Sequence, residues 1–159
     1  MAGKMATGKA ENKEGATIKK RRTRVESLVR MISSEAGMTE IEIVKQGIDA
    51  PLVKAFLSRN LTDSGFLAEF TGIPRSTIHK RLQSAARFTP GESDRIMTSF
   101  RIVDLATRLF EGDREGAMRW LDTPHRLLNG ETPRERAQTS SGAAQIERLI
   151  GRIEHGNAA

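Results

Sequence analysis

Apolar side chains recur every three or four residues along most of this chain, which is the spacing of amphipathic α-helices. The clearest stripe lies near the C-terminus, where Ile146, Leu149, Ile150 and Ile153 occupy positions i, i+3, i+4 and i+7. A longer stripe comprises Ile96, Phe100, Val103, Ala106 or Thr107, and Phe110. We therefore expect an all-helical protein in which both of these helices bury an apolar face.

Helix-start signals divide the chain into the segments that these stripes predict. Thr39, Thr89 and Thr132 are each followed three residues later by a glutamate, which is the pattern of a capping box. Thr123-Pro124 and Thr132-Pro133 each place an N-cap oxygen before a proline at the first helical position. These signals predict helices over about 40–46, 50–59 and 90–110, and three short amphipathic pieces within 117–156.

Residues 64–83 have the spacing of a helix-turn-helix. Ala68 is small enough for two helices to cross closely, Gly72 permits the turn, and Ile73, Ile78 and Leu82 are placed to fill the shared core. The polar positions on the other side of the second helix are Arg75, Ser76, His79, Lys80 and Gln83. In a helix-turn-helix such positions face the major groove of DNA, so these five residues are the candidate DNA-binding set.

The charge around this segment favours DNA as its partner. The segment between Glu69 and Glu92 contains no acidic residue, but it contains four basic ones: Arg75, Lys80, Arg81 and Arg87. We therefore expect a locally basic surface. The alternative is a generic helix pair with a solvated charged face.

The net charge of the chain is concentrated at its N-terminus. Of 159 residues, the first 24 hold eight Lys or Arg and two Glu, which accounts for the whole net charge of +6. This segment is rich in glycine and poor in large apolar residues, so we expect it to be disordered. It is either a basic arm that contacts DNA phosphates or a solubilising tail.

Composition argues against several other classes of protein. Only 4% of the residues are aromatic, so the core is expected to be aliphatic, with Trp120 as one anchor. Cysteine is absent, and no apolar run approaches the roughly 20 residues of a membrane span, as fits a soluble cytoplasmic protein. The three histidines lack the spacing of metal ligands, and no nucleophile or phosphate-binding motif is recognisable. We expect neither an enzyme nor a cofactor.

Near the C-terminus several motifs follow one another in order: Ala117, Trp120-Leu121, Thr123-Pro124, Leu128, Gly130, Thr132-Pro133, Thr139, Gly142 and Arg152-Ile153-Glu154-His155-Gly156. This block resembles the toxin-binding domain of the Xre/ParS/MbcA family of bacterial antitoxins. Residues 64–83 resemble the Xre-type helix-turn-helix that precedes it, so the resemblance covers roughly residues 41–156. Family members pair with RES-domain toxins, which attack NAD or use it to modify a target.

The chain departs from the family pattern at two places. His125 stands where the family usually has Asn, and residues 134–137 (RERA) replace a turn that is usually rich in leucine. We expect this second turn to be more exposed or to face a different partner.

The resemblance implies an antitoxin that blocks the NAD site of a RES-domain toxin with its C-terminal segment and represses its own operon. The candidate toxin-binding residues are Arg152, Glu154, His155, Gly156 and Asn157.

The expected organisation is a tail (1–24), a helix-turn-helix domain (25–88), a connecting helix (89–112) and a toxin-binding domain (113–159). Expected partners are the toxin, operator DNA and a second copy of the chain, within a toxin–antitoxin hetero-oligomer. The alternative is a stand-alone dimeric helix-turn-helix regulator. The polar residues at 152–156 favour the antitoxin, because a C-terminal helix that serves only for dimerisation needs no such residues.

Overall fold

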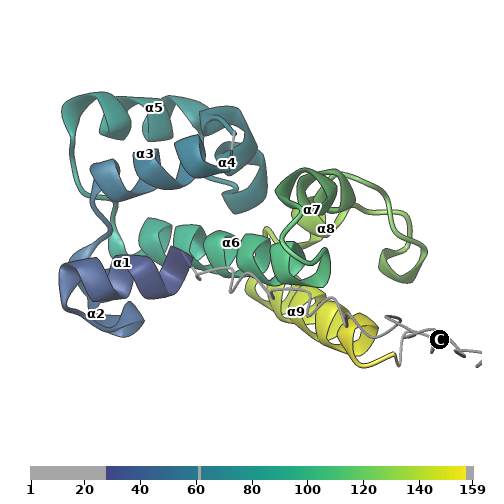
Figure 1. The fold of residues 1–159 in the computed structure, drawn as a ribbon. Helices are drawn as coiled ribbons and strands as arrows, with labels where there is room; N and C mark the ends of the chain where they lie inside the picture. The colour runs from purple at the N-terminus through teal and green to yellow at the C-terminus, as the bar shows by residue number, and fades with distance from the viewer. Residues whose placement is uncertain (1–27, 61, 157–159) are drawn as a thin grey trace, which may run out of the picture.

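The computed structural model describes residues 28–60 and 62–156, and every element in these ranges is helical, without a strand (Figure 1). The elements are α1 (Leu28–Ala36), α2 (Glu40–Gln46), α3 (Ala50–Arg59), α4 (Ser64–Thr71), α5 (Arg75–Ser84), α6 (Pro90–Leu109), α7 (Arg114–Leu121), the 3-10 helix η1 (Arg126–Leu128), α8 (Pro133–Arg136) and α9 (Ser140–Glu154). The prediction of an all-helical protein is confirmed. The expectations for the basic tail and for Asn157 lie outside the described residues.

Helix α6 is the central element of the fold. It contacts α1, α2, α4, α7 and α9, and in Figure 1 it runs between α3–α5 above and α2 and α9 below. The ring of Phe100 in α6 stacks on the ring of Phe56 in α3, with 3.6 Å between the ring centroids. The buried positions of α6 are Ser93, Ile96, Met97, Ser99, Phe100, Ile102, Val103, Asp104, Ala106 and Thr107. The buried face is therefore wider than the single predicted stripe, because other helices cover α6 from several sides.

The three predicted capping boxes are confirmed. At the start of α6, for example, the Thr89 N–H donates to Glu92 Oε2 (2.8 Å), and the Glu92 N–H donates to Thr89 Oγ1 (3.3 Å). The same reciprocal bonds begin α2 at Thr39 and α8 at Thr132. These bonds satisfy backbone donors that the first turn of a helix leaves without a partner.

The interpretation of Thr123-Pro124 as a helix start is wrong. The Thr123 hydroxyl donates to the Arg119 carbonyl at the end of α7 (2.7 Å), so it completes one helix instead of beginning another. The N-cap of the following element, η1, is His125, whose Nδ1 accepts from the Leu127 N–H (3.2 Å). This contact also explains His125 in the place of an asparagine, because both side chains can accept a hydrogen bond from the backbone at an N-cap.

Helix α9 carries the predicted apolar stripe into the core. Ile146, Leu149 and Ile150 are buried, and Ile153 is half-buried. Gly142 lies in its first turn, where a β-carbon would lie 1.8 Å from the Arg136 carbonyl oxygen. Only glycine allows the start of α9 to lie this close to α8.

No helix in the described ranges has both the length and the hydropathy needed to span a bilayer.

Candidate functional site

The five candidate DNA-binding residues lie together on one face of α5. Arg75, Ser76, His79, Lys80 and Gln83 are all exposed. On the other side of α5, Ile78 is completely buried and Leu82 is partly buried against the core. The helix thus presents a continuous polar face, with apolar side chains holding it against α3 and α4.

A tight turn between α4 and α5 sets the direction of that face. Gly72 caps α4 in the left-handed conformation (φ 67°), and its N–H donates to the Ala68 carbonyl (2.9 Å). The Thr71 hydroxyl donates to the Leu67 carbonyl (2.7 Å) and accepts from the Ile73 N–H (3.2 Å). These bonds satisfy the backbone through the turn, and the predicted role of Gly72 is confirmed.

The basic surface around α5 is smaller than the sequence predicts. Arg75 lies 3.4 Å from Asp63, and Arg87 lies 3.0 Å from Asp49, so acids from other segments offset both cations. Arg81 pairs with Glu92 at 3.0 Å, and its side chain is only 25% exposed. Among the described residues Lys80 has no ion-pair partner. The absence of acids in the local sequence was misleading, because the fold brings acids from elsewhere.

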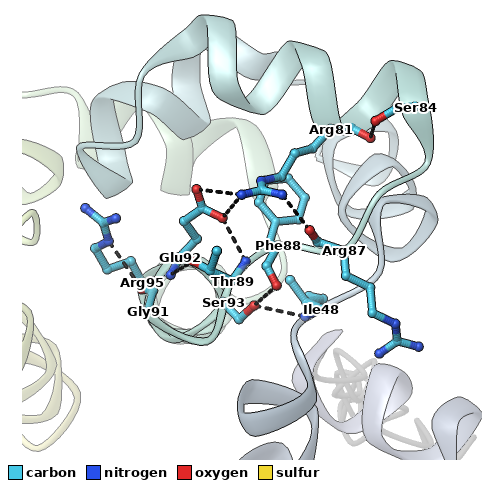
Figure 2. A network of polar contacts seen from close by, with 10 residues as sticks. All are labelled: Ile48, Arg81, Ser84, Arg87, Phe88, Thr89, Gly91, Glu92, Ser93 and Arg95. Atoms are coloured by element: carbon cyan, nitrogen blue, oxygen red, sulfur yellow. Dashed lines mark hydrogen bonds and ion pairs between the residues drawn. The ribbon is translucent and has the colours of Figure 1, made fainter.

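Arg81 joins the end of α5 to the start of α6 (Figure 2). Its Nη1 donates to the Arg87 carbonyl (2.8 Å), and its guanidinium lies over the Phe88 ring, 5.7 Å from the centroid. Glu92 is 13% exposed. Burial by itself raises the pKa of Glu92, but the hydrogen bonds from Thr89 and Arg81 outweigh burial and hold that pKa below its usual value. Arg81 is therefore a structural residue, and its inclusion in the expected basic surface is wrong.

The candidate toxin-binding residues lie at the other end of the fold, at the C-terminus of α9. Arg152, Glu154, His155 and Gly156 are all exposed. Nδ1 of His155 lies 2.6 Å from the Gly151 carbonyl, so this imidazole closes the last turn of α9. Within residues 28–60 and 62–156, neither Arg152 nor Glu154 forms an ion pair. The fifth candidate, Asn157, lies beyond the described residues.

The turn with the sequence RERA faces α4 of the same chain. Arg134, its first arginine, lies 3.0 Å from Glu69 of α4 and 3.0 Å from Asp122, the C-cap residue of α7. Its guanidinium lies over the ring of Phe66 of α4, 5.1 Å from the centroid, and the side chain is 18% exposed. Of the two expectations for this turn, exposure is wrong for Arg134, and a different partner protein stays a prediction. No sequence signal links residue 134 to residues 66 and 69, so sequence reasoning missed this contact.

Two carboxylates, those of Asp122 and Glu69, lie at the Arg134 guanidinium. Burial raises the pKa of Asp122, Arg134 lowers it, and Glu69 raises it, with a net shift above its usual value. The Arg134 guanidinium therefore pairs with two carboxylates, that of Glu69 in α4 and that of Asp122 at the end of α7.

Comparison of the sequence with known proteins shows which family this chain matches. Residues 105–156 match the family model for the antitoxin Xre/MbcA/ParS C-terminal toxin-binding domain. A Yersinia enterocolitica (serotype O:8 / biotype 1B) protein named Antitoxin Xre is 32% identical over 136 residues, which are 84% of this chain and 92% of the relative. A protein of the same name from Photorhabdus laumondii subsp. laumondii is 34% identical over 123 residues, or 77% of this chain and 83% of the relative. A third Antitoxin Xre, from Pseudomonas putida, is 33% identical over 84 residues, or 53% of this chain and 52% of the relative. The family-model match contains α7, η1, α8, α9 and the end of α6.

Proposed function

Because this chain belongs to the Xre/MbcA/ParS family of antitoxins, we propose that it neutralises a RES-domain toxin by placing its C-terminal segment in the toxin's NAD-binding site. The observation that carries the proposal is the end of α9, where exposed polar residues follow a buried apolar stripe within the matched domain. The resemblance of residues 117–156 to this family implies the RES class of toxin.

The chemistry of this ending suits a pocket that binds a dinucleotide. Glu154 is an acceptor-only anion, so it can occupy a position that a phosphate takes among cationic and hydrogen-bonding groups. Arg152 can pair with an acidic group of the toxin, and His155 and Asn157 can make short polar contacts. Gly156 has φ 71°, which lets the backbone turn tightly beyond the helix. Inhibition is then competitive occlusion of the NAD site, and the toxin needs no conformational change.

The direct test uses the product of the neighbouring gene. We expect the two proteins to co-purify, and we expect the full chain to suppress NAD consumption by the purified toxin. A chain that binds operator DNA but no toxin would instead support the stand-alone helix-turn-helix regulator, whose C-terminal helices serve only to dimerise it.

The exposed face of α5 supports a second activity, repression of the operon that encodes the pair. In this proposal α4 and α5 form a helix-turn-helix, and Arg75, Ser76, His79, Lys80 and Gln83 face the major groove. The chain binds as a dimer, alone or with toxin, because operator half-sites mirror the symmetry of the protein. The tail before α1 adds phosphate contacts in this proposal.

We expect Arg75→Ala and Lys80→Ala each to weaken operator binding by about 1–3 kcal/mol, because each removes a side chain placed to contact a base edge. Fluorescence anisotropy with an operator duplex measures the loss. Lys45→Ala is the matched control, because Lys45 is an exposed lysine on α2, on the other side of α6. The assignment of α5 fails if both α5 variants bind the operator as tightly as the unaltered chain.

A further inference from the structure

We propose that Leu127, in the η1 loop (residues 125–131), binds the toxin by entering an apolar pocket on the toxin's surface. This inference rests on the proposed function, and it adds a contact that is separate from the C-terminal segment. The η1 loop belongs to the matched toxin-binding domain. Leu127 itself is not one of the positions on which the resemblance to the family rests.

The exposure of Leu127 distinguishes it from the other large apolar residues of this domain. Leu127 is 44% exposed, whereas its neighbour Leu128 is 1% exposed and packs in the core. In the part of the chain that the structure describes, Ile41 is the one other exposed large apolar residue, and it lies on α2, outside the matched domain. A single exposed leucine is common on a protein surface and indicates nothing by itself. The loop that carries Leu127 and the charge beside it supply the further evidence.

Hydrogen bonds within the η1 loop hold its backbone in one conformation. The His125 N–H donates to the Glu131 carbonyl (3.0 Å), which closes the loop at its base. The His125 carbonyl accepts from the N–H groups of Leu128 (2.9 Å) and Gly130 (3.2 Å). Nδ1 of the same histidine accepts from the Leu127 N–H (3.2 Å). Because the loop is fixed before a partner arrives, binding requires little further ordering of its backbone.

The direction of the Leu127 side chain follows from its neighbours in η1. A 3-10 helix has three residues per turn, so successive side chains point about 120° apart. Leu128 points into the core, and Leu127 is therefore turned away from it. Asn129 ends η1 in the left-handed conformation (φ 57°), which asparagine adopts more readily than most residues. The loop thus presents Leu127 to solvent from a support that Leu128 holds in place.

The charge beside Leu127 indicates which kind of pocket the loop fits. Arg126 is exposed and forms no ion pair with any residue that the structure describes. An exposed leucine next to such a cation fits an apolar pocket with a carboxylate at its rim. The toxin is the partner for this position, because residues 105–156 match a toxin-binding domain. In Figure 1 the chain between α7 and α8 projects at the right of the view, where α9 also ends, so one partner can contact both.

The Leu127 contact contributes affinity, and the C-terminal segment contributes inhibition. Burial of an exposed leucine on binding is favourable in proportion to the apolar area that it removes from water. Removal of residues 154–159 leaves the η1 loop in place, because all the hydrogen bonds that close the loop lie within residues 125–131. A truncated chain therefore keeps its contact with the toxin.

The experiment measures the affinity of the full chain for the purified product of the neighbouring gene by isothermal titration calorimetry. Leu127→Ala should weaken binding about tenfold, as the loss of a well-buried interface side chain does. Leu127→Asp should weaken it further, because a carboxylate loses its water in an apolar pocket. Both variants should keep the urea midpoint of the unaltered chain, because Leu127 is exposed. Arg126→Gln should weaken binding more at low salt than at high salt, because salt screens an exposed ion pair.

Two comparisons separate this contact from general effects of losing an apolar side chain. Ile41→Ala is the matched control, because Ile41 is 67% exposed and lies outside the matched domain. It should bind the toxin as tightly as the unaltered chain. Leu127→Ala in a chain without residues 154–159 should weaken binding by about the same tenfold, because contacts that share no partner contribute independently.

Equal toxin affinity of Leu127→Ala and the unaltered chain overturns the proposal, and so does an equal loss in Ile41→Ala. If Leu127→Ala changes the oligomeric state in analytical ultracentrifugation and leaves toxin affinity unchanged, the loop is an interface between two copies and the proposal is wrong. An effect of Arg126→Gln that is the same at all salt concentrations overturns the acidic rim. Full inhibition by the truncated chain contradicts insertion into the NAD site and leaves the Leu127 contact standing. If the unaltered chain binds no toxin, the proposed function fails and this inference fails with it.

Discussion

Removing residues 154–159 should leave an antitoxin that still forms a complex but no longer protects cells from the toxin. The deletion takes only the last residue of α9 and the residues after it, so Ile146, Leu149 and Ile150 stay buried and the helix stays docked. The polar segment proposed to enter the NAD site is lost. Growth of cells that express the toxin, together with NAD binding by the purified complex, measures the effect.

A single substitution refines this experiment. Glu154→Gln removes the anion proposed to take a phosphate position, and it should weaken inhibition more than Glu115→Gln does. Glu115 is a matched control, because its side chain on α7 is 84% exposed. Full protection by the truncated chain, with NAD binding still blocked, would refute insertion. It would favour the alternative in which a broad helical surface covers the pocket.

Arg81→Ala should lower the free energy of unfolding by about 1–3 kcal/mol, because it leaves the partly buried Glu92 carboxylate without its cation. The cation–π contact with Phe88 and the hydrogen bond to the Arg87 carbonyl are lost with it. Urea unfolding followed by circular dichroism measures the change. Arg75→Ala is the control, since its exposed pair with Asp63 should contribute less than about 1 kcal/mol. Similar losses in the two variants would contradict the structural role of Arg81.

The ion pair between Arg81 and Glu92 should also affect how the free energy of unfolding depends on pH. The pKa of Glu92 in the folded protein is lower than its unfolded value of 4.5, so its ionised form favours folding. That stabilisation is present above pH 4.5 and is lost as the pH falls through the folded pKa. Arg81→Ala should therefore lose less stability on acidification than the unaltered chain, as a urea titration at several pH values would show.

Features that depend on neighbours in the sequence could be predicted. The capping boxes at Thr39, Thr89 and Thr132 are formed by residues three positions apart, so the bonds follow from the local chain alone. The exposed face of α5 and the buried stripe of α9 follow equally from helical periodicity. Thr123-Pro124 is the exception, because the Thr123 hydroxyl is bound to the Arg119 carbonyl and a proline here does not begin a helix.

The charge of the surface around α5 could not be predicted from the sequence in the same way. The acid-free run after Glu69 predicts a locally basic surface, yet Asp49, Asp63 and Glu92 lie outside this run and pair with three of its four cations. Only Lys80 among these four has no ion-pair partner within the described residues. A charged surface depends on which segments meet in space, and local composition does not record it.

Sequence alone determined that the chain is helical, where most helices begin, which faces of α5 and α9 carry polar residues, and which family the C-terminal block resembles. The helical properties rest on hydrogen bonds and periodicities that span a few residues, and the resemblance rests on motifs that follow one another in order over residues 117–156. The tertiary structure alone decided that Arg81 pairs with Glu92 at the start of α6, and that Arg134 joins the toxin-binding domain to α4. Those pairs are 11 and 65 residues apart in sequence, between Arg81 and Glu92 and between Glu69 and Arg134. The pair between Glu69 and Arg134 forms only because helices from both halves of the chain pack around α6.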